Sequence, residues 1–514
     1  MSANMEQPNS WLMNTKPVSQ QIVAVIGAGT MGAGIAQVAA AAGHPVRLMD
    51  ARSGAAGEAH QKIGGVLQSL VDKGRMGAGE RETLLERIVP IDTLSDLRDA
   101  SLVVEVIVEN LQIKQKLLNE VETHVSRDAI IASNTSSISI TALANGMAHP
   151  DRLVGMHFFN PVPLMKLVEV VSGAETSTEV AAIIYDLAKR WGKTPVHAKS
   201  TPGFIVNRIA RPFYAEALAL LQEQACAPAE IDRVMRSAGF RMGPCELMDL
   251  IGHDINYSVT LSVFDANYGD RRYVPSLVQK ALVDGGRLGR KVGKGFYDGT
   301  PVQPAAAMKG RADTPIKVAG VGLLAQRLAD LLESAQADFS RDMGMEWTGL
   351  QVGEVALHVS DGRTANELAA SRACRNIGVI DLPLSNGNDR AIAIAFASSV
   401  QNEHRDLVKA ALGNSGLQPV ELRDVPGLVV ARTIAMLINE GADAVYQGVC
   451  DEQGADVAMK LGTNYPAGPF EWLDQLGIDY TLAILNNLFN AYRSERYRVS
   501  PLLQHSYWTE RIPA

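Results

Sequence analysis

A glycine-rich turn near the beginning of the chain constrains the fold more than any other segment. Residues 21–32 read QIVAVIGAGTMG, an apolar run followed by three glycines and then by an Ala-rich stretch with helical spacing. A glycine-rich turn between a strand and a helix is typical of dinucleotide-binding α/β domains. The segment therefore predicts a strand, a tight turn, and a helix whose N-terminus can hold a diphosphate.

The first two hundred residues alternate short apolar runs with helical patterns. Six of these runs are rich in β-branched residues and predict strands at 22–27, 46–49, 102–107, 129–133, 152–158 and 165–171. Ala-rich or amphipathic stretches separate several of them. Such alternation predicts a Rossmann-type domain with a mostly parallel, doubly wound sheet.

An internal repeat determines how the rest of the chain is organised. TPGFIVNRIARPFYAEALAL (201–220) recurs as VPGLVVARTIAMLINEGADA (425–444), and MGPCELMDLIG (242–252) recurs as AGPFEWLDQLG (467–477). Both segments have helical spacing and are punctuated by Pro and Gly, so we expect an all-α domain in two copies. Residues 316–332, IKVAGVGLLAQRLADLL, resemble a degraded strand–turn–helix. The region after them lacks an acidic residue ending a second strand, and we expect it to bind no cofactor.

Composition excludes several classes of protein. The chain has 514 residues, a net charge of −8 and a pI near 5.8, so it offers no broad basic surface for nucleic acid or an anionic membrane. Its four cysteines show no C-x-x-C spacing, which predicts neither disulfides nor a zinc site. No apolar run is long enough to span a bilayer, and the polar N-terminal residues do not resemble a signal peptide. We expect a cytoplasmic protein without a metal.

The glycine turn and the next strand together indicate the cofactor. Gly27 permits the tight turn, Gly29 lets the backbone approach a pyrophosphate, and Gly32 allows close packing of helix on sheet. Asp50 ends the next strand, where a carboxylate accepts hydrogen bonds from a ribose and repels a 2′-phosphate. This favours NAD, although Arg52 leaves use of NADP open. The predicted cofactor-binding residues of this part are Gly27, Gly29, Thr30, Met31, Gly32 and Asp50.

A histidine and a glutamate in neighbouring apolar strands indicate proton transfer. His157 stands in GMHFFNP, and Glu169 stands in KLVEVV, where an unpaired carboxylate would be costly to bury. A carboxylate that holds a histidine in one tautomer suits a base that receives an alcohol proton. The alternative for His157 is a core histidine with satisfied ring nitrogens. Asn207, in PGFIVNR, is either a ligand or an amide on a helix surface.

Residues 20–297 resemble the family of L-3-hydroxyacyl-CoA dehydrogenases. The resemblance rests on VIGAGTMGAGIAQ (25–37), VVEVIVEN (103–110), ASNTSSISI (132–140), GMHFFNPVPLMKLVEVV (155–171), KTPVHAKSTPGFIVNRI (193–209), GPCELMDLIG (243–252) and KVGKGFY (291–297). The whole chain, with its second α domain, resembles the long single-function members of bacterial phenylacetate breakdown. Those members are associated with 3-hydroxyadipyl-CoA or 3-hydroxybutyryl-CoA.

The resemblance implies NAD-dependent oxidation of a (3S)-3-hydroxyacyl-CoA and assigns roles to individual residues. It makes His157 the general acid/base and Glu169 its partner, while Ser136 and Asn207 hold the 3-oxygen or the thioester oxygen. Lys114 is also expected near coenzyme A. The residues implied to line the cofactor cleft are Glu109, Lys114, Asn134, Ser136, Asn160 and Lys291.

The changes in sequence pattern along the chain and the internal repeat also predict a division into domains. We expect a flexible tail, an NAD-binding Rossmann-type domain, a first all-α domain, a linker, a degenerate α/β segment, and a second, non-catalytic all-α domain. The expected ranges are 1–19, 20–200, 201–298, 299–315, 316–423 and 424–514. In the second α domain Ala431 stands where the first has Asn207. The repeat is therefore expected to act as a pseudo-dimer, with a homo-oligomer also possible.

Several alternatives remain open at this stage. A 3-hydroxybutyryl-CoA dehydrogenase of general fatty-acid or butanoate metabolism would carry the same motifs. A sugar-acid or β-hydroxyacid dehydrogenase would share the nucleotide fold but would rely on a lysine base. A non-catalytic structural protein on this scaffold would not need to keep all four residues of the implied centre. A terminal carboxylate on the acyl group would need a cation, and Arg208, Arg211 and Arg241 are candidates.

Overall fold

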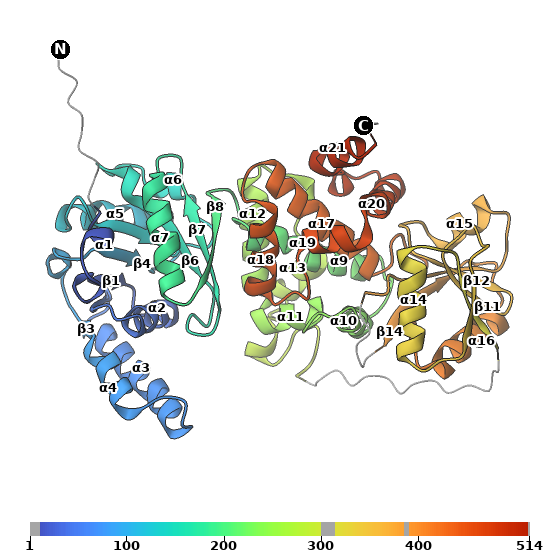
Figure 1. Cartoon of the computed structure of the whole chain (residues 1–514), viewed down its shortest axis with the longest axis horizontal. Coiled ribbons are helices and arrows are strands. Elements are labelled where there is room, and N and C mark those ends of the chain that lie inside the picture. Colours follow the sequence, from blue (N-terminus) through green and yellow to red (C-terminus); the bar gives the residue numbers. More distant parts are fainter. Residues whose placement is uncertain (1–10, 300–313, 385–389, 512–514) are drawn as a thin grey trace, which may run out of the picture. The chain divides into compact units, whose positions relative to one another are not determined.

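The computed structural model of the chain describes residues 11–299, 314–384 and 390–511 (Figure 1). These residues form two compact units. One contains the described residues up to Val206 together with Gly448–Gly462, and the other contains Asn207–Gln447 and the described residues from Thr463 onward. The predicted linker at 299–315 lies almost wholly outside the described residues.

The first unit is built on an eight-stranded sheet in the order β3-β2-β1-β4-β5-β6-β7-β8. The strands from β3 to β6 are parallel, β7 runs antiparallel to β6, and β8 is parallel to β7. This order confirms the predicted Rossmann-type fold, because the chain reverses direction across the sheet at β1 and β4. In chain order the strands are β1 Val23–Ile26, β2 Val46–Met49, β3 Ile88–Pro90, β4 Leu102–Glu105, β5 Ile130–Ser133, β6 Leu153–Phe158, β7 Leu167–Ser172 and β8 Thr194–Lys199.

Helices connect these strands and bury the apolar faces of the sheet. Strands β1, β4 and β5 are buried on both faces, which explains why they read as continuous apolar runs. The sequence analysis did not predict the short strand β3 or the strand β8, in which exposed residues interrupt the buried ones. It also did not predict the helix pair α3–α4, which extends away from the sheet (Figure 1). The helices are α1 Leu12–Thr15, α2 Thr30–Ala41, α3 Ala55–Asp72, α4 Ala78–Glu86, α5 Leu111–His124, α6 Ile140–Leu143, α7 Thr178–Arg190 and α18 Glu452–Thr463.

The flexible tail predicted for residues 1–19 is wrong for its second half. Trp11 and Met13 are only 3% and 1% exposed and belong to the core of the first unit. The Leu12 N–H also donates to the Asp128 carbonyl at 3.1 Å. Polar neighbours concealed these two apolar anchors in the sequence. Residues 1–10 lie outside the described part.

The second unit contains the first helical repeat, the second repeat apart from Gly448–Gly462, and a second sheet of seven strands in the order β10-β9-β11-β12-β13-β14-β15. This arrangement confirms the predicted fold class. Its strands are β9 Ile316–Ala319, β10 Phe339–Asp342, β11 Gly349–Val352, β12 Val355–Val359, β13 Ile377–Ile380, β14 Ala391–Phe396 and β15 Gln418–Glu421. The longer helices are α9 Arg211–Gln222, α10 Pro228–Ser237, α11 Pro244–Ile251, α12 His253–Ala266, α13 Leu277–Asp284, α14 Leu323–Ser334, α16 Asn402–Asn414, α17 Val430–Tyr446, α19 Pro469–Leu476, α20 Ile478–Tyr492 and α21 Pro501–Thr509, and the short ones are α8 Val206–Ile209 and α15 Ala365–Ser371.

One expectation about the second sheet is wrong. The sequence was expected to lack an acidic residue ending the second strand, but Asp342 ends β10 next to β9. Its carboxylate lies 3.6 Å from the Lys317 ammonium and accepts from the Gly344 N–H at 3.1 Å. It therefore serves its own strand and turn.

The two helical repeats are joined by reciprocal buried ion pairs. Arg208 Nε donates to Glu440 at 2.7 Å, and Arg432 Nε donates to Glu216 at 2.9 Å. Arg432 and Glu440 lie 224 positions after Arg208 and Glu216 respectively. Each repeat thus offers its arginine to the glutamate of the other. This is the pattern of a two-fold symmetric interface, here formed within one chain.

The same reciprocity extends to a second pair of residues in each repeat. Arg272 and Tyr273 contact one glutamate, with 3.3 Å from Arg272 Nη1 and 2.6 Å from the Tyr273 hydroxyl. Arg496 and Tyr497, 224 positions later, contact the other glutamate at 2.9 and 3.0 Å. The duplication therefore preserved the contacts between the repeats as well as their helices.

Within residues 11–299, 314–384 and 390–511, no helix is long and apolar enough to cross a membrane. The same ranges contain no group of three or more His, Cys, Asp or Glu side chains that could hold a metal ion.

Candidate functional site

The glycine turn after β1 has a separate physical reason for each glycine. Gly27 has a φ of +112°, and a Cβ there would lie 2.4 Å from the Val106 carbonyl oxygen. A Cβ at Gly32 would lie 1.7 Å from the Gly27 carbonyl oxygen, so this position must be glycine for packing. A Cβ at Gly29 would meet no protein atom within 4 Å. The protein therefore leaves open space at Gly29, which would allow a pyrophosphate to approach the backbone.

A cavity of about 590 Å³ begins at this turn. Its lining includes Gly29, Thr30, Asp50 and Asn160, and its size suits a nucleotide. Met31 packs against the core of the first unit. The residues present thus fit the predicted cofactor, with amide donors at the start of α2 and a carboxylate beside them.

The carboxylate of Asp50 is fixed by backbone amides. One oxygen accepts from the Ala28 N–H at 2.7 Å, and the other accepts from the Arg52 N–H at 2.9 Å. The Arg52 guanidinium forms a paired contact with Glu58, at 2.9 and 2.7 Å. Its charge is therefore engaged locally, which supports a preference for NAD over NADP.

Replacing Asp50 with alanine is expected to raise the KM for NAD+ about tenfold to a hundredfold, because hydrogen bonds to a charged group are lost. The kcat should change little, since Asp50 lies on the nucleotide side of the site. Steady-state kinetics and a fluorescence titration with NADH measure the effect. Asp92→Ala, which removes an exposed carboxylate, is the matched control. An unchanged KM would remove Asp50 from cofactor binding.

His157 and Glu169 face each other across two antiparallel strands. Their Cα atoms are register partners in β6 and β7, and His157 Nδ1 lies 2.5 Å from Glu169 Oε2. The other oxygen, Glu169 Oε1, accepts from the N–H groups of Ile205 and Val206, each at 3.0 Å. The start of α8 thus holds the carboxylate, and the carboxylate holds the imidazole.

This arrangement fixes the tautomer of His157. Because Glu169 already accepts two amide protons, Nδ1 donates to it and Nε2 carries the lone pair. Nε2 has no hydrogen-bond partner among the described residues, whereas Phe159 and Phe204 flank the ring with centroids at 4.5 and 5.9 Å. His157 is therefore not a core histidine with both ring nitrogens hydrogen-bonded. The geometry provides a base whose conjugate acid is stabilised by a neighbouring carboxylate.

Ser136 lies in a loop after β5 that is organised by Glu109. Glu109 Oε1 accepts from Thr135 Oγ1 at 2.7 Å, from the Ser136 N–H at 2.9 Å, and from Ser137 Oγ at 3.0 Å. Burial raises the pKa of Glu109, but the hydrogen bond from Thr135 and the charge of Lys114 outweigh it and lower the pKa. Glu109 therefore stays ionised and holds the serine loop.

Lys114 has a different environment from the one the resemblance implies. It is 1% exposed, and its ammonium lies 2.6 Å from Glu105 and 3.4 Å from Glu109. An enclosed ammonium with two carboxylate partners argues against contact with coenzyme A. Sequence reasoning missed Glu105, which is buried at the end of β4 and also accepts from Ser133 Oγ at 2.6 Å. An acidic residue inside the apolar run LVVEVI was the available signal.

Asn134 connects the serine loop to the histidine strand. Its Oδ1 accepts from the Phe158 N–H at 2.8 Å, one residue after His157. Asn160 follows two positions later and lines the cofactor cavity. In the first unit the structure therefore brings the glycine turn, Asp50 and Asn160 around one cavity, and separately links Glu109, Asn134, Ser136 and His157 through the ends of β4, β5 and β6.

Two of the implied site residues belong to the second unit. Asn207 follows Val206 directly in the chain and lies in α8. Lys291 forms an exposed ion pair with Asp254 at 2.5 Å. At the corresponding helix of the second repeat, Asp381 accepts from the N–H groups of Val429, Val430 and Ala431 at 2.9, 2.7 and 2.9 Å.

The second repeat keeps a carboxylate that accepts hydrogen bonds from the start of its helix, but it lacks the histidine of the first repeat. Ala393 in β14 pairs with β15 in the same way as Glu169 in β7 pairs with β8. Ala393 therefore occupies the position that corresponds to Glu169. The acceptor carboxylate, Asp381, instead follows β13 and bonds to the Ala393 carbonyl through its own N–H at 2.9 Å. A carboxylate at a helix N-terminus stabilises the helix by itself. This half therefore retains the structural bond without a histidine base.

Comparisons with known proteins agree on one family. Residues 22–201 match a model described as 3-hydroxyacyl-CoA dehydrogenase, NAD binding domain, and residues 203–299 and 427–512 match the 3-hydroxyacyl-CoA dehydrogenase, C-terminal domain. Residues 357–426 match the 3-hydroxybutyryl-CoA dehydrogenase reduced Rossmann-fold domain. The models thus cover both helical repeats and the degenerate segment between them.

Two of the similar proteins, both from Escherichia coli, cover nearly the whole chain. It is 43% identical over 490 residues to the 3-hydroxyadipyl-CoA dehydrogenase of Escherichia coli K12, covering 95% of this chain and 97% of the relative. A crystal structure of 3-hydroxybutyryl-CoA dehydrogenase from E. coli K12 superposes with a TM-score of 0.87 at 41% identity, covering 96% of this chain and 99% of that one. The (S)-3-hydroxybutyryl-CoA dehydrogenase of Ralstonia eutropha is 39% identical with a TM-score of 0.53, covering 54% of this chain and 99% of that one.

Proposed function

The chain belongs to the 3-hydroxyacyl-CoA dehydrogenase family, and from this premise we propose that His157, Glu169, Ser136 and Asn207 form its catalytic centre. The enzyme is an oxidoreductase that acts on 3-hydroxyacyl-CoA with NAD as cofactor. The single observation that carries the proposed centre is the contact of 2.5 Å between His157 Nδ1 and Glu169, which leaves Nε2 as a base. Membership of the family sets aside the lysine-dependent alternative.

In the proposed mechanism, His157 Nε2 removes the proton from the 3-hydroxyl group of the substrate. NAD+, when bound, supplies the hydride acceptor. Glu169 stabilises the imidazolium that forms, and its bonds to the amides of Ile205 and Val206 keep it in place. Ser136 and Asn207 hold the substrate oxygens, which fixes the carbon that loses hydride. In the reductive direction the protonated His157 returns its proton to the oxygen.

We propose 3-hydroxyadipyl-CoA as the preferred substrate. Support comes from the long E. coli relative that bears this name and matches 95% of the chain. The alternative is 3-hydroxybutyryl-CoA, the substrate named for the long E. coli crystal structure and for several shorter relatives. Both are oxidised by the same centre, so the difference must lie in contacts to the far end of the acyl group.

Purified enzyme is expected to reduce NAD+ with both (3S)-thioesters, with a kcat/KM at least tenfold higher for 3-hydroxyadipyl-CoA, about 1.4 kcal/mol of discrimination. Absorbance of NADH at initial rate measures this, and parallel assays with NADP+ and with the free acid serve as controls. A higher kcat/KM for 3-hydroxybutyryl-CoA would reverse the proposed preference. Absence of reaction with every thioester would contradict the proposed catalytic centre.

We propose a structural role for the second repeat and a cytoplasmic location. The reciprocal pairs Arg208–Glu440 and Arg432–Glu216 support a pseudo-dimer within the chain. Ala431 offers no side-chain hydrogen bond where the first repeat has Asn207. The four cysteines are all free thiols, which suits a reducing compartment.

A further inference from the structure

The second unit separates the three arginines that could bind a carboxylate at the end of an acyl chain. Arg208 is engaged by Glu440 at 2.7 Å and by the Gln447 side chain at 2.9 Å. Arg241 is exposed to solvent. Arg211 differs from both because it is only 6% exposed and has no carboxylate partner among the described residues. It is the one buried guanidinium of the three whose charge is not neutralised.

The contacts of Arg211 hold its side chain in place but do not neutralise its charge. Nε donates to the Asn207 carbonyl at 2.8 Å, Nη1 donates to Thr260 Oγ1 at 3.1 Å, and the guanidinium lies 5.0 Å from the centre of the Tyr214 ring. Burial lowers the pKa of Arg211, and no nearby carboxylate reverses this effect. A buried, unpaired charge is destabilising, so an anion that enters during function is a physical reason to keep it.

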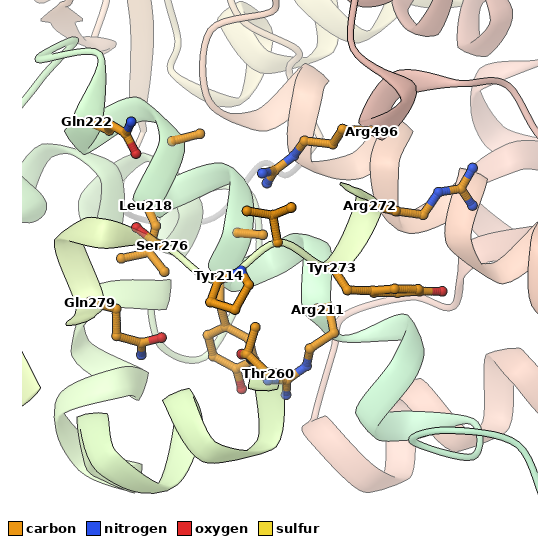
Figure 2. A pocket seen from close by; sticks show the side chains of 14 residues that line it. Arg211, Tyr214, Leu218, Gln222, Thr260, Arg272, Tyr273, Ser276, Gln279 and Arg496 are labelled. Atoms are coloured by element: carbon orange, nitrogen blue, oxygen red, sulfur yellow. Dashed lines mark hydrogen bonds between the residues drawn. The ribbon is translucent and has the colours of Figure 1, made fainter. Parts of the chain in front are cut away.

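Arg211 lines a cavity of about 90 Å³ in the second unit (Figure 2). This volume corresponds to roughly three waters, enough for a carboxylate and a neighbouring methylene. No Asp or Glu contributes to the lining. Figure 2 shows Arg211 beside Tyr214 and Thr260, with Arg496 approaching from another side. Arg496 Nη2 has no hydrogen-bond partner among the described residues, while Arg496 Nε is paired at 2.9 Å with Glu216, which does not line the cavity.

The spacing between Asn207 and Arg211 along the helix is of the same order as the length of a six-carbon dicarboxylic chain. The two residues are four positions apart along α8 and the start of α9, about one helical turn or 6 Å. In a 3-hydroxyadipyl group, three carbon–carbon bonds separate C3 from the terminal carboxyl carbon, about 4 Å when extended. A four-carbon acyl group has no carboxylate and ends one bond beyond C3.

We propose that Arg211 binds the terminal carboxylate of an ω-carboxylated 3-hydroxyacyl-CoA and thereby determines the preference for this class of substrate. The inference rests on the proposed function, in which Asn207 holds the oxygen near C3. Arg211 is a specificity-determining residue and takes no part in hydride or proton transfer. A carboxylate paired with it would form a charge-assisted contact that an unsubstituted chain cannot make.

The test compares two acyl chains of equal length in the full-length enzyme. Arg211→Met is expected to lower kcat/KM for 3-hydroxyadipyl-CoA about a hundredfold, mostly through KM, because a buried charge pair is lost. For 3-hydroxyhexanoyl-CoA, which ends in a methyl group, kcat/KM should stay within threefold or rise. Calorimetric binding of adipyl-CoA and hexanoyl-CoA, which lack the reacting hydroxyl, should show the same contrast. Arg241→Met is the matched control and should change neither substrate.

Each outcome either supports or contradicts the inference. Equal losses on both substrates would give Arg211 a structural role, and an unchanged kcat/KM for the adipyl substrate would exclude the contact. If Arg211→Met does not fold, Arg211→Lys takes its place, with a selective loss of about tenfold expected, because lysine cannot pair in the bidentate manner. Wild-type enzyme that oxidises 3-hydroxyhexanoyl-CoA without preferring the adipyl substrate would overturn this inference alone. Wild-type enzyme inactive on both thioesters would overturn the proposed function itself.

Discussion

Replacing His157 with glutamine is expected to lower kcat by about 10²-fold to 10⁴-fold, the range attributed to loss of a general acid/base. Glutamine keeps the approximate size of the imidazole but cannot accept the hydroxyl proton. The affinity for NADH should stay close to that of the wild-type enzyme, because the glycine turn and Asp50 are unchanged. Single-turnover kinetics and a fluorescence titration with NADH measure the two quantities separately.

The control for this substitution is His197→Gln, which changes an exposed histidine of β8 that stacks on Tyr185. It should leave kcat unchanged. Glu169→Gln provides a second comparison, because the N–H groups of Ile205 and Val206 hold the amide oxygen and the amide nitrogen then faces Nδ1, which imposes the wrong tautomer on the imidazole. A kcat for His157→Gln within tenfold of wild type would show that another group accepts the proton.

Replacing Arg432 with methionine is expected to destabilise the second unit by about 3–5 kcal/mol, the cost of leaving a buried ion partner unpaired. Arg432 and Glu216 are both 0% exposed, and Arg432 also contacts Glu223 and the Tyr497 hydroxyl. Urea or guanidinium unfolding followed by far-UV circular dichroism measures the change. The reciprocal substitution Arg208→Met should have an effect of similar size, because Arg208 holds Glu440 in the same way.

The dependence of this effect on pH provides an independent check. Burial raises the pKa of Glu216, but the charges of Arg496 and Arg432 outweigh it and lower the pKa below the value of 4.5 expected when unfolded. The stabilisation is therefore fully present above pH 4.5 and is lost as the pH falls through the lowered pKa. The difference between wild type and Arg432→Met should shrink under acid.

An exposed ion pair is the matched control for the buried one. Lys280 and Asp284 form an exposed pair at 2.7 Å on α13. Lys280→Met should change the free energy of unfolding by less than about 0.5 kcal/mol. An Arg432→Met variant as stable as wild type at neutral pH would contradict the view that the reciprocal pairs hold the repeats together.

The sequence was most informative where the residues of a short segment by themselves indicate its structure or its environment. The first sheet followed from β-branched runs, because strands such as β4 and β5 are buried on both faces and read as continuous apolar segments. The histidine and the glutamate could be singled out because polar residues inside apolar strands need a partner. The nucleotide turn could be recognised because Gly27 and Gly32 have backbone reasons to be glycine.

Other features could not be read from the sequence because they depend on partners distant in the chain. Trp11 and Met13 anchor a segment that looks like a polar tail, since only the fold brings Asp128 next to Leu12. Lysine is usually a surface residue, but Lys114 is buried and paired with Glu105 and Glu109. Asp342 escaped notice because its strand is short and half exposed.

The sequence by itself determined the Rossmann-type domain, the duplicated helical domain, the preference for NAD, and the pairing of a histidine with a carboxylate. These depend on periodicity, on glycine geometry, and on the cost of burying charge, all of which are local properties. The tertiary structure alone decided which arginine is neutralised and which is not, and that the repeats exchange their ion pairs reciprocally. Those facts depend on distances between residues more than two hundred positions apart, which no local pattern encodes.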